Sequence, residues 1–289
     1  MNDTNRLRVA AISFLNPAPL LYNFEHEPAK SHLAARYAVD YTLPSQCAAQ
    51  LASGEADLGL IPIAAMPYIP EVVAVPGCTI ASLDKVRSIQ LILRPGVTLA
   101  TIKTLATDAA SRSSAAYVRT ILHHFYGVQP QVHEETAHLQ HMLQTSDAAL
   151  LIGDHALLAL EDREGNQHAF AREAGYTWID VAELWRQHTD LPWVAAVWAV
   201  RPEALDRTDI TRGQLIDDLE DSRKAGQSNI PIITADWQPR LHLSTETIHH
   251  YLTENIHYTL DVDCQQAIER FYELAASANV LPPYHLPFL

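Results

Sequence analysis

The chain alternates short, mostly apolar runs with longer stretches in which apolar residues recur at helical spacing. The clearest apolar runs are residues 7–12, 57–61, 86–93 and 191–200, and a proline follows shortly after each of them. Runs of this length and character are typical of strands that are buried on both faces of a sheet. Because helical stretches separate them, the pattern predicts α/β units around mostly parallel sheets.

The helical stretches have recognisable ends. A helix predicted to begin near Ser111 has one apolar face, and Gly127 follows it as a typical helix stop. Gly153 and Asp154 form the turn between a strand and a further helix. The C-terminal third is predicted to be mainly helical, with helices over 211–225, 244–256 and 264–278. Ser244 is expected to cap the second of these helices.

This order of elements is compatible with two α/β lobes. In that arrangement the runs at 86–93 and 191–200 are strands that cross between the lobes, and the middle of the chain is an insertion. We expect the first lobe to comprise 1–90 and 198–289, and the second lobe 91–197. The strand ends of the two lobes would then face each other across a cleft, where open α/β sheets bind their ligands.

Composition and charge limit the class of partner. The chain of 289 residues carries a net charge of −14 at pH 7, which argues against a nucleic acid or an anionic membrane as partner. The apolar run near the N-terminus is short and ends in Asn-Pro, so it is interpreted as a strand and not as a signal peptide. No apolar run reaches the length of a membrane span. These features predict a cytoplasmic protein.

Neither metal nor cofactor chemistry is expected from the motifs. The 15 histidines include three close sets, at 123–124, 138 with 141, and 249–250, but none has the spacing of a zinc site. The three cysteines are too few and too scattered for a disulfide framework or a thiolate site. Glycine-rich phosphate motifs and the GxSxG nucleophile motif are missing from the sequence.

The best candidate for chemistry is the stretch "DAASRSSAAYVR". Its small hydroxyl residues Ser111 and Ser113 stand at a predicted helix start, where free backbone N–H groups and the helix dipole favour an anion. Arg112 between them offers a bidentate fork for a carboxylate. The alternative is ordinary capping by the serines and a solvated arginine, and for this motif alone the alternative is favoured.

Three further polar residues stand at strand ends, and each has a structural alternative. Asn16, followed by Pro17, either caps a helix or faces a ligand. Ser88 lies in an apolar run, where its hydroxyl needs a partner, and a backbone carbonyl would suffice. Asp154 either caps the following helix or takes part in a site. Together they place donors at the strand ends of both lobes.

These stretches, read in order, resemble the chorismate dehydratase family, the first enzyme of the futalosine route to menaquinone. The resemblance rests on "ISFLNPAPL", "PSQCAAQLASGEADLGLIPI", "VRSIQLIL", "DAASRSSAAYVR", "LLIGDHAL", "LWRQHTDLPWVAAVWAV" and "IERFYELA". It extends over nearly the whole chain with the blocks in the same order. The family has the fold of type II periplasmic solute-binding proteins, so the resemblance implies two α/β lobes, two crossing strands and a ligand in the cleft.

The chain departs from the family at a few positions. The family often has Tyr where this chain has Phe14, and Thr where it has Pro17 and Ser113. Since proline lacks a backbone N–H, no ligand contact through that group is expected at Pro17. A sister enzyme of the same pathway, which gives a dihydroxynaphthoate, typically has a Ser-Pro-Cys-Pro-Asn-Asp type of turn after its first strand. The turn at 13–17 therefore favours the chorismate enzyme.

The resemblance implies a reaction and a set of roles. The expected reaction removes water across C3 and C4 of chorismate to give 3-[(1-carboxyvinyl)oxy]benzoate, with the enolpyruvyl carboxylate of the substrate as base. Asn16 is expected to bind and orient the reacting part of the substrate, and Ser88 to donate a further hydrogen bond. Ser111, Arg112 and Ser113 are expected to hold a carboxylate, whereas the role of Asp154 is left open.

Two other functions stay open at this point. One is a non-catalytic protein of the same fold that binds a small carboxylate, and the other is the sister naphthoate-forming enzyme. For each of these functions the partner is a small molecule. A homodimer is compatible with the apolar faces of the C-terminal helices, which serve equally well as core.

Overall fold

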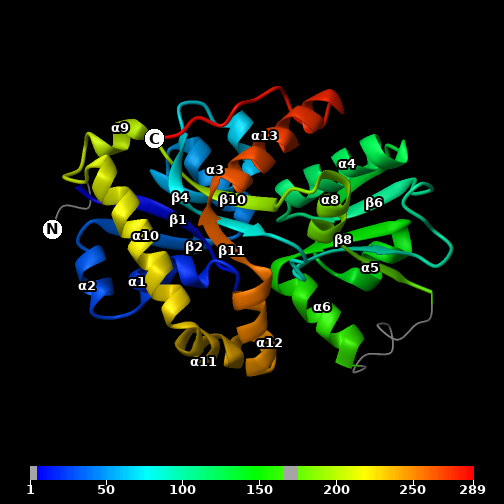
Figure 1. Cartoon of the computed structure of the whole chain (residues 1–289), viewed down its shortest axis with the longest axis horizontal. Helices are drawn as coiled ribbons and strands as arrows, with labels where there is room; N and C mark the ends of the chain where they lie inside the picture. The colour runs from blue at the N-terminus through cyan, green and yellow to red at the C-terminus, as the bar shows by residue number, and fades with distance from the viewer. Residues whose placement is uncertain (1–4, 166–174) are drawn as a thin grey trace.

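The apolar runs become strands of two separate sheets. The structure is a computed structural model, and it describes residues 5–165 and 175–289. The first sheet has six strands in the order β11-β4-β10-β3-β1-β2. These strands are β1 (Leu7–Ile12), β2 (Tyr37–Thr42), β3 (Leu58–Pro62), β4 (Val73–Ser82), β10 (Trp193–Val200) and β11 (His257–Leu260). This sheet and the helices around it are called lobe 1 (Figure 1).

The second sheet lies beside the first, on the right in Figure 1, and its order is β7-β6-β8-β5-β9. Its strands are β5 (Ile89–Leu93), β6 (Thr104–Asp108), β7 (Gln131–Glu135), β8 (Ala148–Ile152) and β9 (Thr177–Asp180). This sheet and its helices are called lobe 2. The predicted architecture of two α/β lobes is therefore confirmed.

The prediction of mostly parallel sheets is wrong in detail, because both sheets are mixed. In lobe 1, β2 and β3 run parallel to β1, whereas β10 and β4 pair antiparallel. In lobe 2, β7 and β8 run parallel to β6, whereas β5 pairs antiparallel with β8 and β9. Strand β11 at the edge of the first sheet also pairs antiparallel, with β4.

Two segments connect lobe 1 and lobe 2. The first runs over 83–88, from the end of β4 to the start of β5, and the second leads over 190–192 into β10. The predicted strand at 86–93 thus begins three residues late, at Ile89, and residues 86–88 belong to the first crossing segment. Strand β10 pairs along its whole length with lobe 1. The expected lobe boundaries at 90/91 and 197/198 stay a prediction.

Helices cover both sheets, and most of the C-terminal third of the chain is helical. In lobe 1 they are η2 (Ala18–Leu21), α1 (Tyr22–Glu25), α2 (Ala29–Leu33), α3 (Pro44–Ser53), η3 (Ile63–Tyr68), α9 (Pro202–Leu205), α10 (Arg212–Ser228), α11 (Ile230–Leu241), α12 (Thr245–His250), the π-helical turn η4 (Tyr251–Asn255) and α13 (Val262–Ser277). In lobe 2 they are α4 (Ser113–Tyr126), α5 (Leu139–Thr145), α6 (Gly153–Gly165) and α8 (Val181–Thr189). None of the helices in the described ranges combines the length and apolar character needed to cross a bilayer.

Most of the predicted helix ends are confirmed. Gly127 ends α4 in the left-handed conformation with φ 68°, and the side chain of Ser244 accepts from the amide of Thr247 at the start of α12. Several elements are absent from the sequence-based prediction, among them α11 and β11. Helix α11 has prolines at both ends of its sequence, and β11 is only four residues long, so neither has a clear periodic pattern.

The far ends of β1 and β3 are tied together by a buried carboxylate. Asp57, which is 1% exposed, accepts from the backbone and side chain of Arg8 and from Arg207. Burial by itself raises the pKa of Asp57, but the hydrogen bonds from Arg8 and the charges of both arginines hold it below its ordinary value. These contacts at the amino ends of β1 and β3 help to set the register of the two strands, and so the relative position of their carboxyl ends.

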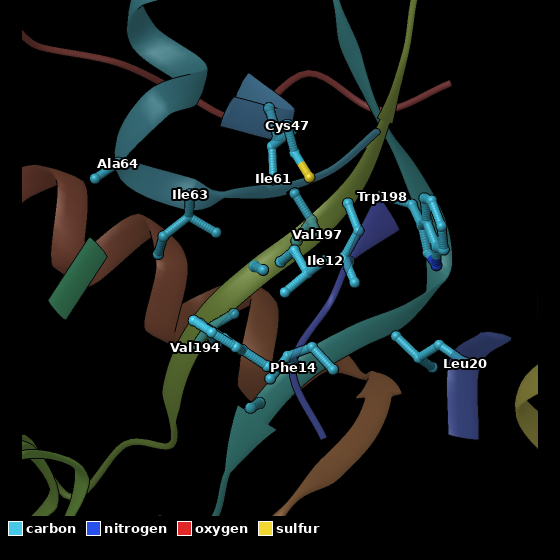
Figure 2. Close-up of a cluster of buried hydrophobic side chains, with 14 of the residues drawn as sticks. Ile12, Phe14, Leu20, Cys47, Ile61, Ile63, Ala64, Val194, Val197 and Trp198 are labelled. Atoms are coloured by element: carbon cyan, nitrogen blue, oxygen red, sulfur yellow. The ribbon is translucent and has the colours of Figure 1, made fainter. Parts of the chain in front are cut away.

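The core of lobe 1 extends to the edge that faces lobe 2. Ile12 and Phe14 at the end of β1, Ile63 after β3, and Val194 and Val197 on β10 belong to one cluster of buried side chains (Figure 2). Phe14 is 7% exposed although it lies in the turn after the strand. The turn that begins the candidate site is therefore anchored by core packing.

Candidate functional site

Four strand ends meet where the lobes face each other. In lobe 1, β1 and β3 are parallel neighbours, and in lobe 2, β6 and β8 are parallel neighbours. Their carboxyl ends therefore lie about 5 Å apart within each sheet. Hydrogen bonds join the end of β1 to the end of β8, and the end of β3 to the helix that follows β6. The sequence-based expectation of facing strand ends is confirmed.

The first contact between the lobes joins the turn after β1 to the start of α6. The amide of Leu15 donates to Oδ1 of Asp154 at 3.0 Å. Gly153 has φ +59°, and a Cβ placed on it would come within 2.6 Å of two ring atoms of Phe14. Only glycine combines this backbone conformation with so close an aromatic ring. The lobes are thus in contact at this point.

The second contact is made by Ser113 at the first position of α4. Its hydroxyl donates to the carbonyl oxygen of Ala195 on β10 at 2.6 Å and accepts from the amide of Ala64 at 3.3 Å. Both partners belong to lobe 1, whereas Ser113 belongs to lobe 2. The side chain predicted to bind a carboxylate is therefore occupied by a bridge between the lobes.

The N-terminus of α4 offers backbone donors. Ser111 precedes the N-cap residue Arg112, and its hydroxyl accepts from the amide of Ala115 in the first turn at 3.2 Å, so this hydroxyl has a structural partner. Among the described residues the amides of Ser113 and Ser114 have no acceptor. Free amides at the start of a 14-residue helix favour an anion, because they add to the dipole of the helix.

Arg112 lies at a cavity between the lobes but is paired. Its Nη1 donates to Oε1 of Glu134 on β7 at 2.8 Å, and its side chain is 46% exposed. The cavity has a volume of about 480 Å³, which is within the range of small-molecule sites. Residues of both lobes line it, among them Ser45, Ala64 and Ala65 of lobe 1 and Thr107, Ser111 and Arg112 of lobe 2.

Asn16 does not cap a helix. The N-cap position of η2 is Pro17, and no side chain donates or accepts at that helix start. Instead, Oδ1 of Asn16 is buried without a hydrogen-bond partner in the described part of the chain. Buried polar atoms without a partner are uncommon, and each of them calls for an explanation. The capping alternative is therefore wrong for Asn16.

Ser88 is fully buried in the first crossing segment, and its partner is a residue that the sequence did not suggest. The phenol of Tyr251 in η4 donates to Oγ of Ser88 at 2.7 Å, and both side chains are at most 1% exposed. The alternative of a bond to a backbone carbonyl is not what the structure has. Since 163 residues separate the two in sequence, no local signal could have indicated this pair.

Asp108 and His155 are further polar residues that the sequence analysis missed, and they join the ends of β6 and β8. Nδ1 of His155 lies 3.7 Å from Oδ2 of Asp108, which is a buried oxygen, and the other oxygen accepts from the amide of Ala110. The Asp108 carboxylate raises the pKa of His155. Asp108 and His155 both stand at strand ends, close in sequence to the predicted site residues Ser111 and Asp154. This position was the sequence signal that could have identified them.

Asp154 is held in an environment that disfavours its charge. Burial raises the pKa of Asp154 to about 6, although the amide of Leu15 and the charge of His155 act in the opposite direction. The folded protein therefore binds the proton better than the unfolded chain, whose aspartate has a pKa of about 4. Between these values the folded state holds more protons, so stability falls as pH rises.

We expect this pH dependence to disappear in Asp154→Asn, which keeps a hydrogen-bond acceptor for the amide of Leu15. Between about pH 4 and about pH 6, the free energy of unfolding of the wild type should fall by about 1–3 kcal/mol relative to the variant. Urea titrations at several pH values measure the difference. A difference that is constant with pH would contradict the raised pKa of Asp154.

The histidine sets do not form a metal centre in the described residues. His138 caps α5 by accepting from the amide of His141, and His124 contacts the carbonyl of Leu274. A different group, His257, Asp261 and Cys264, brings potential ligand atoms within 4.8 Å of one another. Asp261 caps α13 through the amide of Cys264 and contacts His257 at 2.8 Å, which accounts for the cluster without an ion.

Comparisons with known proteins extend this picture. The chain is 26% identical over 243 residues to a protein from Thermus thermophilus named chorismate dehydratase. The matched region covers 82% of this chain and 86% of that protein.

Among solved structures, protein AF1704 from Archaeoglobus fulgidus matches with a TM-score of 0.70 and 13% identity, covering 97% of this chain and 100% of that one. The alkanesulfonate-binding protein SsuA from Xanthomonas axonopodis pv. citri matches with a TM-score of 0.65 and 12% identity, covering 98% and 96%. The fold is thus that of periplasmic binding proteins. A family model described as menaquinone biosynthesis matches residues 7–277, and the chain belongs to this family.

Proposed function

We propose that this protein is a chorismate dehydratase, which converts chorismate to 3-[(1-carboxyvinyl)oxy]benzoate in menaquinone biosynthesis. The family to which the chain belongs and its similarity to a protein of that name support the assignment. The reaction is a hydro-lyase step: the proton leaves C3, the hydroxyl leaves C4, and one water is released. Because the product ring is aromatic, the thermodynamic driving force lies in the substrate.

The observation that carries the proposal is a set of polar atoms without partners near the contacts between the lobes. Among the described residues the amides of Ser113 and Ser114 have no acceptor, and Oδ1 of Asn16 is buried and has no donor. Free amides suit a carboxylate of the substrate, whereas the amide oxygen of Asn16 accepts and suits its hydroxyl. The first carboxylate of the substrate binds at the N-terminus of α4, where the hydroxyl of Ser111 already stabilises the helix end.

Asn16 orients the reacting part of the substrate, and Ser88 donates from the first crossing segment. No general base is required of the protein when the enolpyruvyl carboxylate takes the C3 proton. Asp154 then serves best in its protonated form, since a second negative charge beside the dianion would be unfavourable. Contact between the lobes excludes water and fixes the reactive geometry of the substrate.

The direct test is incubation of the purified protein with chorismate. An aromatic enolpyruvyl product should accumulate well above the uncatalysed background, as followed by NMR and by absorbance. Binding of chorismate without turnover would favour a non-catalytic carboxylate-binding protein of the same fold. Formation of a dihydroxynaphthoate from the later intermediate of the pathway would favour the sister enzyme.

Replacement of Arg112 tests the carboxylate site. Arg112→Ala should lower kcat/KM by at least about tenfold, because a charge-assisted hydrogen bond contributes about 1.5–3 kcal/mol. Release of Arg112 from its ion pair in Glu134→Gln should leave kcat/KM unchanged or raise it. Steady-state kinetics with chorismate give both values.

Arg270→Ala is the matched control for Arg112→Ala. Arg270 is 50% exposed and pairs with Glu273 at 3.1 Å, much as Arg112 is 46% exposed and pairs with Glu134 at 2.8 Å. It lies on α13 and does not line the interlobe cavity. Equal rates for the wild type and Arg112→Ala would remove Arg112 from the site.

The cytoplasmic location and the homodimer expected from the sequence are also part of the proposal. Cell fractionation tests the location, and light scattering tests the oligomeric state.

A further inference from the structure

The π-helical turn η4 contacts the first crossing segment through two side chains. Tyr251 donates to Oγ of Ser88 at 2.7 Å, and Nδ2 of Asn255 donates to the carbonyl oxygen of Lys85 at 3.0 Å. Both are buried, and they stand at the first and last positions of the turn. Short π-helical turns inside helices occur frequently at functional sites. Here the turn directs two polar side chains to one short segment of backbone.

Lobe 2 holds the same segment from the other side. The carboxylate of Asp180, at the start of α8, accepts from the amides of Val86 and Arg87 at 3.2 and 2.7 Å. The side-chain amide of Gln90 donates to the same carboxylate. Residues 85–88 thus accept from or donate to side chains of both lobes, and these contacts hold Ser88 between them.

The hydrogen bond from Tyr251 also decides what the hydroxyl of Ser88 can do. In this bond the phenol donates and Oγ of Ser88 accepts, so the hydrogen of Ser88 is left for another acceptor. Among the described residues that hydrogen has none. Burial raises the pKa of Tyr251, although the hydrogen bond to Ser88 acts in the opposite direction.

We propose that Tyr251 is a positioning residue that directs the hydroxyl hydrogen of Ser88 towards the substrate in the interlobe site. This inference rests on the proposed function, which assigns Ser88 to the substrate, and goes beyond it by naming what orients Ser88. Tyr251 does not touch the substrate. It acts by occupying the lone pair of Ser88 Oγ that would otherwise accept a hydrogen bond from water or from a substrate hydroxyl.

The test is a double-mutant cycle of Tyr251→Phe and Ser88→Ala, measured as chorismate turnover. Tyr251→Phe retains the ring and should lower kcat by about tenfold with little change in KM, since orientation of a donor matters most in the transition state. Ser88→Ala should lower kcat at least as much. In the Ser88→Ala background, Tyr251→Phe should cause no further loss, because the effect of Tyr251 passes through Ser88.

Tyr258→Phe is the control for loss of a buried phenol. Tyr258 on β11 is equally buried, and its hydroxyl has no hydrogen-bond partner in the described chain. Its replacement should leave kcat unchanged. Melting temperatures of all four variants separate a change of fold from a change of turnover.

Three outcomes would overturn the inference. They are a rate for Tyr251→Phe equal to that of the wild type, the same loss in the Ser88→Ala background as in the wild type, and an equal loss in Tyr258→Phe. A variant Tyr251→Phe that does not fold leaves Ser88→Ala as the deciding measurement, since a wild-type rate there would also overturn it. A wild type without turnover would instead refute the proposed function, so the two failures are distinguishable.

Discussion

Asn16→Ala is expected to lower kcat with chorismate by about 100-fold, the scale on which loss of one well-placed hydrogen-bonding group acts in a buried site. The physical reason is that the carboxamide of Asn16 has no structural task. Its Oδ1 is buried and has no partner in the described chain, and it caps no helix there. Steady-state kinetics measure kcat and KM, and KM should change less than kcat if Asn16 orients the reacting centre.

Stability separates this role from a structural one. If Asn16 held the turn together, its replacement would lower the melting temperature. Since the described chain leaves Oδ1 unpaired, removal of that buried polar atom should leave the melting temperature unchanged or raise it. Asn23→Ala, at a half-buried asparagine of the following helix α1, is the control and should retain the wild-type rate. A lower melting temperature with an unchanged kcat would contradict the assignment of Asn16.

Gly153→Ala is expected to lower kcat/KM by about 10- to 100-fold, because it prevents the lobes from meeting. The added Cβ would lie 2.6 Å from ring atoms of Phe14, and φ +59° is unfavourable for alanine. Overpacking of this kind costs about 1–3 kcal/mol, and the lobes can avoid it by moving apart. Kinetics report the loss, and small-angle scattering should report a larger radius of gyration.

The control for Gly153→Ala has the same backbone strain without the clash. Gly127 has φ +68°, and a Cβ on it would meet nothing within 4 Å. Gly127→Ala should therefore cost stability but leave kcat/KM near the wild-type value. Phe14→Ala combined with Gly153→Ala should restore part of the lobe contact, since the ring that clashes is gone. A wild-type rate for Gly153→Ala would show that contact at this point is not needed for turnover.

The contacts divide the predicted site into two regions. Ser111, Arg112 and Ser113 stand at the α4 side, next to the interlobe cavity, whereas Asn16, Asp154 and Ser88 stand where β1, β8 and the crossing segment meet. A substrate with a carboxylate at one end and a leaving hydroxyl further along the ring suits such a division. In the proposed function, the α4 region binds a carboxylate and the other region supplies neutral hydrogen-bonding groups.

Much of the fold follows from local sequence. The strand predicted at 7–12 has the bounds expected of it, and the helix after residue 111, its stop at Gly127 and the cap at Ser244 are correct. These features depend on periodicity, on a left-handed glycine and on a side chain that reaches an amide three residues away. Such interactions are made within one turn or one strand, so sequence order is sufficient to predict them.

The roles of individual polar groups follow less well from the sequence. The hydroxyl of Ser113 is expected to bind a carboxylate, but it bridges to Ala195, 82 residues away. Arg112 is expected to be a fork for a carboxylate, and its partner in the structure is Glu134 on a neighbouring strand. A polar side chain takes the nearest suitable partner in space, and sequence does not say which one that is.

The sequence by itself predicted the two-lobe α/β plan and the polar residues at the strand ends that we propose as the site. Only the tertiary structure decided which of those polar groups have partners. It paired Leu15 with Asp154 across 139 residues and Tyr251 with Ser88 across 163, and within the described chain it left the carboxamide oxygen of Asn16 without a partner. The physical reason is that a hydrogen bond is set by distances of about 3 Å in space, whereas periodicity and capping report only on neighbours along the chain.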